Sequence, residues 1–307
     1  MPQLQISKSI NISASIDKVY NAVSDLNKWT AWSPWLIMEP EAVVKVSDDE
    51  MSYSWEGKRV GSGNMKIVAQ ETNKSVDYDL NFLKPWKSQA DVRFELSESE
   101  EGTKATWIMD SSLPWFMFWM KKMMTAFVGM DYDRGLNLLK DYVEDGGIHS
   151  KLEFKGVNTY PGCVYVGIKT DCDMDDIATA MEKDMTKVWE LLADKKDKIA
   201  GLPFSIYHKW EMVKRKVSYT IGVPLSEIPE GISGDFISGK IPELSVYTLR
   251  HIGPYKHLGN AWSTLYNMER GKEFKHDKAH HPFETYVNDP SEVSENELIT
   301  DIHFVVK

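Results

Sequence analysis

The stretches that decide the fold of the second half of the chain are Phe204-Ser205-Ile206-Tyr207 and, about 80 residues later, Phe283-Glu284-Thr285-Tyr286. Each occupies the same place in a β-α-β-β pattern that occurs twice. The predicted elements are a strand at 163–169, a helix at 174–193 and strands at 204–210 and 216–224, then a strand at 244–251, a helix at 254–268 and strands at 283–288 and 298–306. The repeat predicts two units that pair their sheets into one pseudo-symmetric α+β domain over residues 155–307.

Both predicted helices have an apolar face that should cover this sheet. The faces consist of Ile177, Met181, Val188, Leu191 and Leu192 in the first helix, and of Leu258, Trp262 and Leu265 in the second.

Several motifs of the second half are shared with a known family. They are His251-Ile252-Gly253-Pro254-Tyr255, Pro282-Phe283-Glu284-Thr285-Tyr286-Val287-Asn288-Asp289-Pro290 and Leu298-Ile299-Thr300-Asp301-Ile302. In this order and spacing they resemble the GyrI-like, or bacterial transcription activator effector-binding, family. The resemblance implies a tandem β-α-β-β effector-binding fold whose central groove takes drug-like, often cationic, aromatic molecules between aromatic walls and a buried carboxylate. Some members of the family resemble hydrolases of strained electrophilic compounds.

Glu284 is the expected carboxylate, because it follows the family's Phe-Glu-x-Tyr motif on a strand that should be central. A desolvated carboxylate among aromatic rings attracts a cation, and its raised pKa also suits acid or base chemistry. The expected ligand-binding residues are Glu284, Tyr255, Tyr286, Tyr207, Trp210 and Trp262, and in a hydrolase Glu284 and Tyr255 would be catalytic. The alternative is an exposed glutamate paired with a lysine, with the aromatic residues in the core.

One position departs from the family pattern. Members commonly carry an acidic residue on the third strand of the first repeat, where this chain has Thr220. The departure weakens the expectation of a cationic ligand and of chemistry that needs two carboxylates.

The first half of the chain is predicted to be a separate domain over residues 1–147. A strand at 4–12 is followed by a short helix that Ser15 can cap, six strands between residues 41 and 110, and a long helix at 115–143. One long helix that closes a strongly curved antiparallel sheet is a helix-grip fold.

The beginning of this half has the residues of a second family. They are Asn11-Ile12-Ser13-Ala14-Ser15, Ser24-Asp25-Leu26 and Trp29-x-x-Trp32-Ser33-Pro34-Trp35, which resemble the START-like (polyketide cyclase/dehydrase, SRPBCC) superfamily. The resemblance implies a cavity for an apolar ligand between sheet and helix. The apolar residues of the closing helix are expected in the core rather than in a ligand site, so side chains could fill the cavity. These residues are Phe116, Trp119, Met120, Met123, Phe127 and Val128.

The most membrane-like run is 113–120, which ends at Lys121 and Lys122. It is far shorter than the ~20 apolar residues that span a bilayer, so no membrane span is expected. The run should be either a core-facing or an interfacial helix start.

Charge and composition limit the other partners. The chain has 307 residues and a formal net charge of −10, which opposes the capture of nucleic acid or of an anionic membrane surface. The two cysteines, Cys163 and Cys172, fit neither a metal site nor a redox motif, and the N-terminus lacks a signal-peptide pattern, so a cytoplasmic location is expected. No metal site and no cofactor are expected, because the histidine-rich segment 276–281 matches no defined ligand spacing and no phosphate-loop motif occurs.

These observations favour a cytoplasmic protein that binds hydrophobic or cationic small molecules in the GyrI-like groove, for sensing or sequestration, without direct contact to nucleic acid. One alternative is a hydrolase of electrophilic small molecules that uses Glu284. Another is a lipid-binding or interaction module that acts through the START-like half, and a protein partner is left open.

Overall fold

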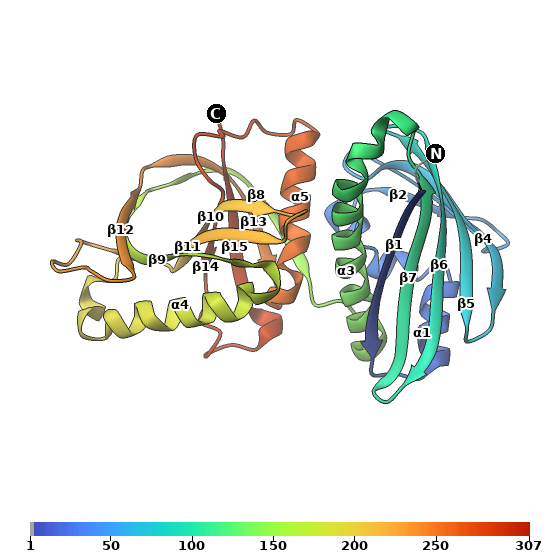
Figure 1. The fold of residues 1–307 in the computed structure, drawn as a ribbon, viewed down its shortest axis with the longest axis horizontal. Coiled ribbons are helices and arrows are strands. Elements are labelled where there is room, and N and C mark those ends of the chain that lie inside the picture. The colour runs from blue at the N-terminus through green and yellow to red at the C-terminus, as the bar shows by residue number, and fades with distance from the viewer. Residues whose placement is uncertain (1–2) are drawn as a thin grey trace. The chain divides into compact units, whose positions relative to one another are not determined.

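The first unit of the chain is a seven-stranded antiparallel sheet closed by one long helix, α3 (Lys121–Asp145). The computed structural model describes residues 3–307, which divide into two units between Ser150 and Lys151 (Figure 1). The strands of the first unit are β1 (Gln3–Ile12), β2 (Val43–Val46), β3 (Ser52–Gly57), β4 (Gly61–Glu71), β5 (Ser75–Lys84), β6 (Ser88–Ser99) and β7 (Gly102–Ser112). Their order is β1-β7-β6-β5-β4-β3-β2, so β2 to β7 form a meander and β1 returns beside β7. The predicted helix-grip fold is confirmed.

Short helices join the first strand to the meander. They are α1 (Ile16–Ser24), α2 (Trp29–Trp32) and the 3-10 turn η1 (Leu36–Met38). Ser15 is the N-cap residue of α1, but its side chain makes no capping hydrogen bond.

Aromatic rings fill the space between sheet and helix. The ring of Trp107 stacks on Tyr132 at 4.0 Å and on Phe94 at 4.9 Å, and Trp29 meets Trp107 edge to face at 5.7 Å. Helix α3 approaches closely at Gly135, where a Cβ atom would lie 2.6 Å from Cζ3 of Trp107. Ring packing therefore determines how much open space this unit retains.

The long helix begins later than the predicted residue 115. Residues Trp115–Met120 form a 3-10 turn, η2, in which no residue is buried, and α3 starts at Lys121. The expectation that the apolar residues here lie in the core is wrong for Phe116, Trp119 and Phe127, which are exposed. The chain leaves the core after Leu113, and the next buried residue is Gly129 on α3. Phe116, Trp119 and Phe127, which lie between these two points, therefore stay outside the core.

The second unit is an eight-stranded antiparallel sheet in which the two predicted repeats lie side by side. Its strands are β8 (Lys151–Tyr160), β9 (Cys163–Asp173), β10 (Phe204–Glu211), β11 (Lys216–Leu225), β12 (Phe236–Ile241), β13 (Leu244–Ile252), β14 (Phe283–Tyr286) and β15 (Ile299–Val305). The order is β12-β9-β11-β10-β14-β15-β13-β8. Strands β10 and β14, which carry the two similar stretches, therefore meet at the centre, with Ser205 opposite Glu284.

Two strands of this sheet were not predicted. Strand β8 precedes β9 in the chain but pairs with β13, and β12 precedes β13 but pairs with β9, so the repeats exchange their first strands. Both lie at the edges of the sheet, where burial does not alternate strictly, and this removes the period of two that reveals a strand. Strand β8 begins at Lys151, ahead of the predicted domain start at 155.

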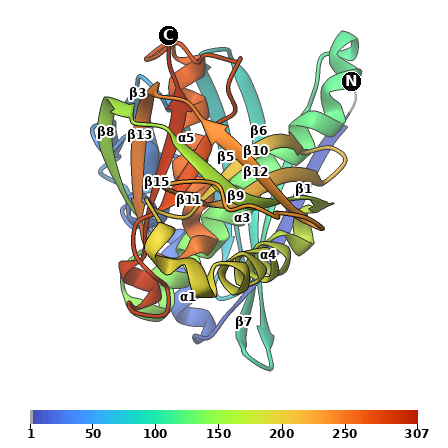
Figure 2. The same cartoon turned by 90° about the vertical axis from the view of Figure 1, so that its left-hand side faces the viewer.

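Two helices pack on the sheet of the second unit (Figures 1 and 2). Helix α4 (Ile177–Leu191) contacts β9 and β11, and α5 (Leu258–Arg270) contacts β13 and β15. The 3-10 turns are η3 (Met174–Asp176), η4 (Ala193–Lys198), η5 (Tyr255–His257) and η6 (Glu295–Glu297). The central strands β10 and β14 therefore lie between the strands that the two helices cover.

A buried histidine makes the stability of the second unit depend on pH. The side chain of His303 on β15 forms hydrogen bonds with Thr248 at 2.9 Å and Thr285 at 3.1 Å, and burial lowers its pKa to about 4. Because the folded pKa is depressed below 6.5, this contribution to stability is present above pH 6.5 and is lost as the pH falls towards 4. We expect the free energy of unfolding to fall by about 2 kcal/mol from this residue between pH 7 and 4.5. Urea unfolding at both pH values should show a smaller fall in His303→Gln, and an unchanged fall would contradict the prediction.

Candidate functional site

Glu284 on β14 is a buried carboxylate held by three neutral donors. Its side chain is 1% exposed. The hydroxyls of Tyr207 and Tyr286 donate to Oε1 at 2.7 and 2.9 Å, and the indole Nε1–H of Trp262 donates to Oε2 at 3.1 Å. Throughout residues 3–307 no lysine, arginine or histidine forms an ion pair with this carboxylate. We call these four residues the Glu284 cluster.

The repeat brings the four side chains together. Side chains alternate along a strand, so Tyr286 points to the same face as Glu284, and Tyr207 to the same face as Ser205, the partner of Glu284 in register. The two tyrosines occupy the same place in the two copies and converge on one carboxylate. Trp262 comes from α5, and from α4 Met181 reaches the hydroxyl of Tyr207, with its sulfur 3.9 Å away.

Burial sets the protonation of the cluster. It raises the pKa of Glu284, and the hydrogen bonds from Tyr207, Tyr286 and Trp262 lower that pKa in part. Burial and the neighbouring carboxylate raise the pKa of both tyrosines well above the ordinary value, so they remain protonated donors. A charge on Glu284 therefore has hydrogen bonds but no counter-charge.

The structure brings Glu284, Tyr207, Tyr286 and Trp262 together. The other two expected site residues, Tyr255 and Trp210, lie beside the two tyrosines. Tyr255 is 41% exposed, and its ring meets that of Tyr286 edge to face at 5.8 Å. Trp210 is 42% exposed, and its ring lies 5.7 Å from that of Tyr207. A β-bulge between Tyr207 and Lys209 shifts the alternation, which lets Trp210 lie beside Tyr207.

The alternative of an exposed glutamate paired with a lysine does not fit Glu284. Its carboxylate is enclosed and its partners are neutral. The tyrosines are not only core residues either, because the hydroxyls of Tyr207 and Tyr286 both bind this carboxylate.

A second buried carboxylate, Asp184, was not found from the sequence. It lies on α4 with 6% exposure and accepts hydrogen bonds from Thr170 at 2.6 Å and Tyr219 at 2.7 Å. Tyr219 pairs with Tyr207 in register, so Asp184 lies on the same face of the sheet as Glu284. The available signal was its spacing, since Asp184 falls between Met181 and Val188 on the apolar face of the helix.

Thr220, where the family commonly has an acid, points to the other face of the sheet. It neighbours Tyr219 on β11, is 1% exposed, and forms a hydrogen bond with Nε2 of His208 at 2.8 Å. Thr220 therefore takes no part in the Glu284 cluster.

The first unit contains a small apolar cavity. Its volume is about 60 Å³, and its walls include Trp29, Trp35, Trp55, Trp107 and Tyr132. Sites for drug-sized ligands have volumes of roughly 300–1,000 Å³. Side chains thus fill most of the space that a helix-grip fold offers to an apolar ligand.

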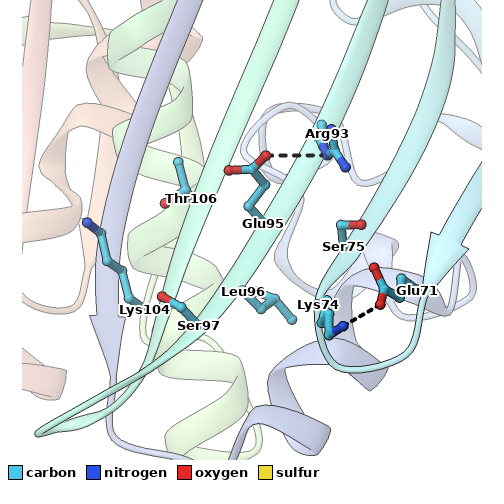
Figure 3. A pocket seen from close by; sticks show the side chains of 9 residues that line it. All are labelled: Glu71, Lys74, Ser75, Arg93, Glu95, Leu96, Ser97, Lys104 and Thr106. Atoms are coloured by element: carbon cyan, nitrogen blue, oxygen red, sulfur yellow. Dashed lines mark hydrogen bonds and ion pairs between the residues drawn. The ribbon is translucent and has the colours of Figure 1, made fainter.

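A shallow hollow on the outer face of the same sheet is polar (Figure 3). Four of its five charged residues form ion pairs: Lys74 with Glu71, and Arg93 with Glu95 at 3.5 Å. The fifth is Lys104, and Leu96 is the single apolar residue of the lining, so this hollow offers no apolar wall for a ligand.

Residues 3–307 contain neither a candidate metal site nor a candidate membrane span. No three histidine, cysteine, aspartate or glutamate side chains converge to hold a metal ion. No helix in this part of the chain is long and apolar enough to cross a membrane.

Two family matches cover most of the chain. Residues 3–144 match the family described as polyketide cyclase / dehydrase and lipid transport, and residues 158–307 match the GyrI-like small molecule binding domain. No curated protein matches the chain.

Some solved structures are distantly similar. EcmrR in complex with DNA is 16% identical, with 63% of this chain and 73% of that chain covered and a TM-score of 0.44. The C-terminal domain of EcmrR is 18% identical, with 52% and 98% covered and a TM-score of 0.42. SAV2435 bound to tetraphenylphosphonium is 18% identical, with 50% and 94% covered and a TM-score of 0.40. At this distance none of the three supports a statement about function.

The family matches agree with the two folds, with the helix-grip sheet in the first unit and the paired repeats in the second. The chain therefore consists of a polyketide cyclase / dehydrase and lipid transport domain at residues 3–144 followed by a GyrI-like small molecule binding domain at residues 158–307.

Proposed function

We propose that the chain is a cytoplasmic protein whose second unit binds hydrophobic cations at the Glu284 cluster. Binding would serve sensing or sequestration of these compounds. The observation that carries the proposal is a carboxylate with 1% exposure whose partners are all neutral. A buried charge without a counter-ion costs several kcal/mol, and a bound cation offsets much of that cost.

Aromatic rings complete the chemistry that a hydrophobic cation needs. Tyr207, Tyr286 and Trp262 surround the carboxylate, and their ring faces attract a cation that has lost its water. Tyr255 and Trp210, which are partly exposed, offer rings to the apolar groups of the ligand. Direct binding to nucleic acid is not part of the proposal, because the net charge of −10 opposes it.

The direct test is to compare a cation with a neutral molecule of similar shape. Isothermal titration of the whole chain with tetraphenylphosphonium and with triphenylphosphine oxide separates charge from hydrophobic contact. We expect the cation to bind at least about tenfold more tightly, which is ~1.4 kcal/mol. Equal affinities, or binding of neither compound, would contradict the proposal.

Tyr207→Phe is expected to weaken cation binding about tenfold. The change removes the shortest hydrogen bond to Glu284, at 2.7 Å, and this bond lowers the pKa of the carboxyl. Its loss leaves less of Glu284 ionised and destabilises the charged form by about 1–3 kcal/mol. The matched control is Tyr165→Phe, because Tyr165 is also buried but packs against Phe204 and Ile241. An equal loss in both variants would show a general effect on the fold.

A second candidate function is hydrolysis of an electrophilic small molecule. The raised pKa of Glu284 favours it, since a carboxyl whose pKa lies above its ordinary value holds a proton more strongly and is a better base. Glu284 would activate water or the substrate, and Tyr255 or Tyr286 would donate a hydrogen bond to the leaving atom. Product formation from an epoxide by the whole chain, and its absence in Glu284→Gln, would favour hydrolysis over binding alone.

A further inference from the structure

The turn η2 exposes a run of large aromatic side chains. Trp115 is 76% exposed, Trp119 67% and Phe118 65%, and Phe116 is exposed beside them. Of the two interpretations of this run, a core-facing and an interfacial helix start, the first is wrong. Monomeric proteins rarely expose contiguous apolar patches of this kind unless the patch binds something.

A second exposed segment lies at the same end of the sheet. The turn between β5 and β6 exposes Trp86 at 66%, and Leu83 near the end of β5 is 46% exposed. Strand register brings the two segments to one end, because β6 starts at Ser88 and Ala90 of β6 lies opposite Ser111 of β7, just before η2. In Figure 1, η2 forms the green turn near the N mark, at the end of α3 away from Asp145. We call this surface the aromatic end, and it consists of Leu83, Trp86, Trp115, Phe116, Phe118 and Trp119.

The segment that contains η2 carries only positive charges between residues 111 and 130, whereas the chain as a whole is acidic. Residues 111–130 contain Lys121 and Lys122 but no aspartate or glutamate, although the whole chain has a net charge of −10. Lys84 and Lys87 flank Trp86, and of these Lys84 pairs with Glu56 at 2.9 Å. Salt screens charges beyond roughly 8–10 Å, so a surface in contact with η2 is affected by Lys121 and Lys122 more than by acids on distant parts of the chain.

We propose that the aromatic end docks the chain on the surface of an anionic lipid bilayer. Tryptophan rings favour the boundary between headgroups and acyl chains, and lysines beside them attract anionic headgroups. The segment is too short to cross the bilayer, so the chain would lie on the surface. A second copy of the chain fits less well, because a twofold contact through this surface would bring lysines of the same sign together.

Vesicle co-sedimentation of the whole chain tests the proposal. We expect binding to vesicles of phosphatidylcholine with about a third phosphatidylglycerol, and weaker binding to phosphatidylcholine alone. Trp115→Ser/Trp119→Ser should lower the partition coefficient at least about tenfold. Both side chains are exposed, so the thermal midpoint of the double variant should stay unchanged. If the midpoint falls, Trp115→Ser alone replaces the double variant in the test. The control is Trp189→Ser on α4, which removes an exposed tryptophan outside the aromatic end.

The lysines and the Glu284 cluster supply independent checks. Lys121→Gln/Lys122→Gln should remove most of the preference for anionic vesicles, whereas Glu284→Gln should leave vesicle binding unchanged. Absence of vesicle binding, or equal binding by the serine variant, would overturn the proposal. Self-association in sedimentation velocity that is lost in Trp115→Ser/Trp119→Ser, without vesicle binding, would instead identify the aromatic end as a contact between copies of the chain.

Discussion

Glu284→Gln is expected to lower the affinity for tetraphenylphosphonium by at least about 100-fold at neutral pH. The amide keeps the size of the side chain and removes its charge, while the cation stays desolvated among Tyr207, Tyr286 and Trp262. Truncating one partner of a buried charge pair costs about 2–5 kcal/mol, and 100-fold corresponds to ~2.7 kcal/mol. Glu292→Gln is the matched control, because Glu292 is an exposed glutamate of the same unit. A loss below about tenfold would show that charge on Glu284 does not hold the ligand.

The same carboxyl should make cation binding depend on pH in one direction. Burial raises the pKa of Glu284 above its ordinary value near 4.5, and the cation binds the ionised form. Affinity should therefore fall as the pH is lowered through the raised pKa, and binding should release a proton where Glu284 is protonated in the free chain. Calorimetric titration in buffers of different ionisation enthalpy measures this proton, and Glu284→Gln should release none. Without ligand, the free energy of unfolding depends on pH in the opposite direction. The contribution of Glu284 to it is present at low pH and is lost as the pH rises through the raised pKa of the folded chain.

The residues that the sequence identified best are those where a motif and a strand period agree. Glu284 and Tyr286 lie two residues apart in one motif, and Tyr207 occupies the place of Tyr286 in the other repeat, so alternation predicts that all three share a face. Trp262 was expected to face the sheet because it lies on the apolar face of its predicted helix. Contact between these residues could not be predicted, because it depends on which strands become neighbours at the centre of the sheet.

The residues that the sequence missed or placed wrongly depend on contacts between distant segments. Asp184 was overlooked because it lies among apolar residues of α4, where only Thr170 and Tyr219 on other elements explain a buried acid. Strands β8 and β12 escaped prediction because each pairs with a strand of the other repeat. Phe116 and Trp119 were expected in the core because they are large and apolar, and whether such residues are covered depends on the fold around them.

Only one of the two repeats has a carboxylate at the position of Glu284. The position of Glu284 is occupied by Ser205 in the other repeat, and the serine hydroxyl binds that of Tyr286 at 2.8 Å. Two carboxylates at this centre would repel each other, and one of them would take up a proton. A serine there retains hydrogen bonding and leaves the Glu284 cluster with one carboxylate, which suits a ligand with one positive charge.

Trp107→Ala is expected to destabilise the first unit by about 3–5 kcal/mol. Trp107 is 1% exposed and stacks between Tyr132 on α3 and Phe94 on β6, so its loss removes a buried contact between helix and sheet. Hydrogen exchange of the β6 and β7 amides reports this unit separately from the other, and protection there should fall by the same free energy. Trp86→Ala is the control, since Trp86 is 66% exposed in the same unit and its loss should change stability by no more than ~0.5 kcal/mol.

The same variant tests whether the first unit is a ligand site that its own side chains fill. Removing the indole enlarges a cavity that is already apolar and about 60 Å³ in volume. An apolar cavity of this kind binds small aromatic molecules, and a ligand that binds only the folded state stabilises it by mass action. Added indole should therefore restore part of the lost protection in Trp107→Ala and leave the parent chain unchanged. If indole restores nothing, the surrounding rings have collapsed into the space, and the closed interior is a property of the whole aromatic cluster rather than of Trp107 alone.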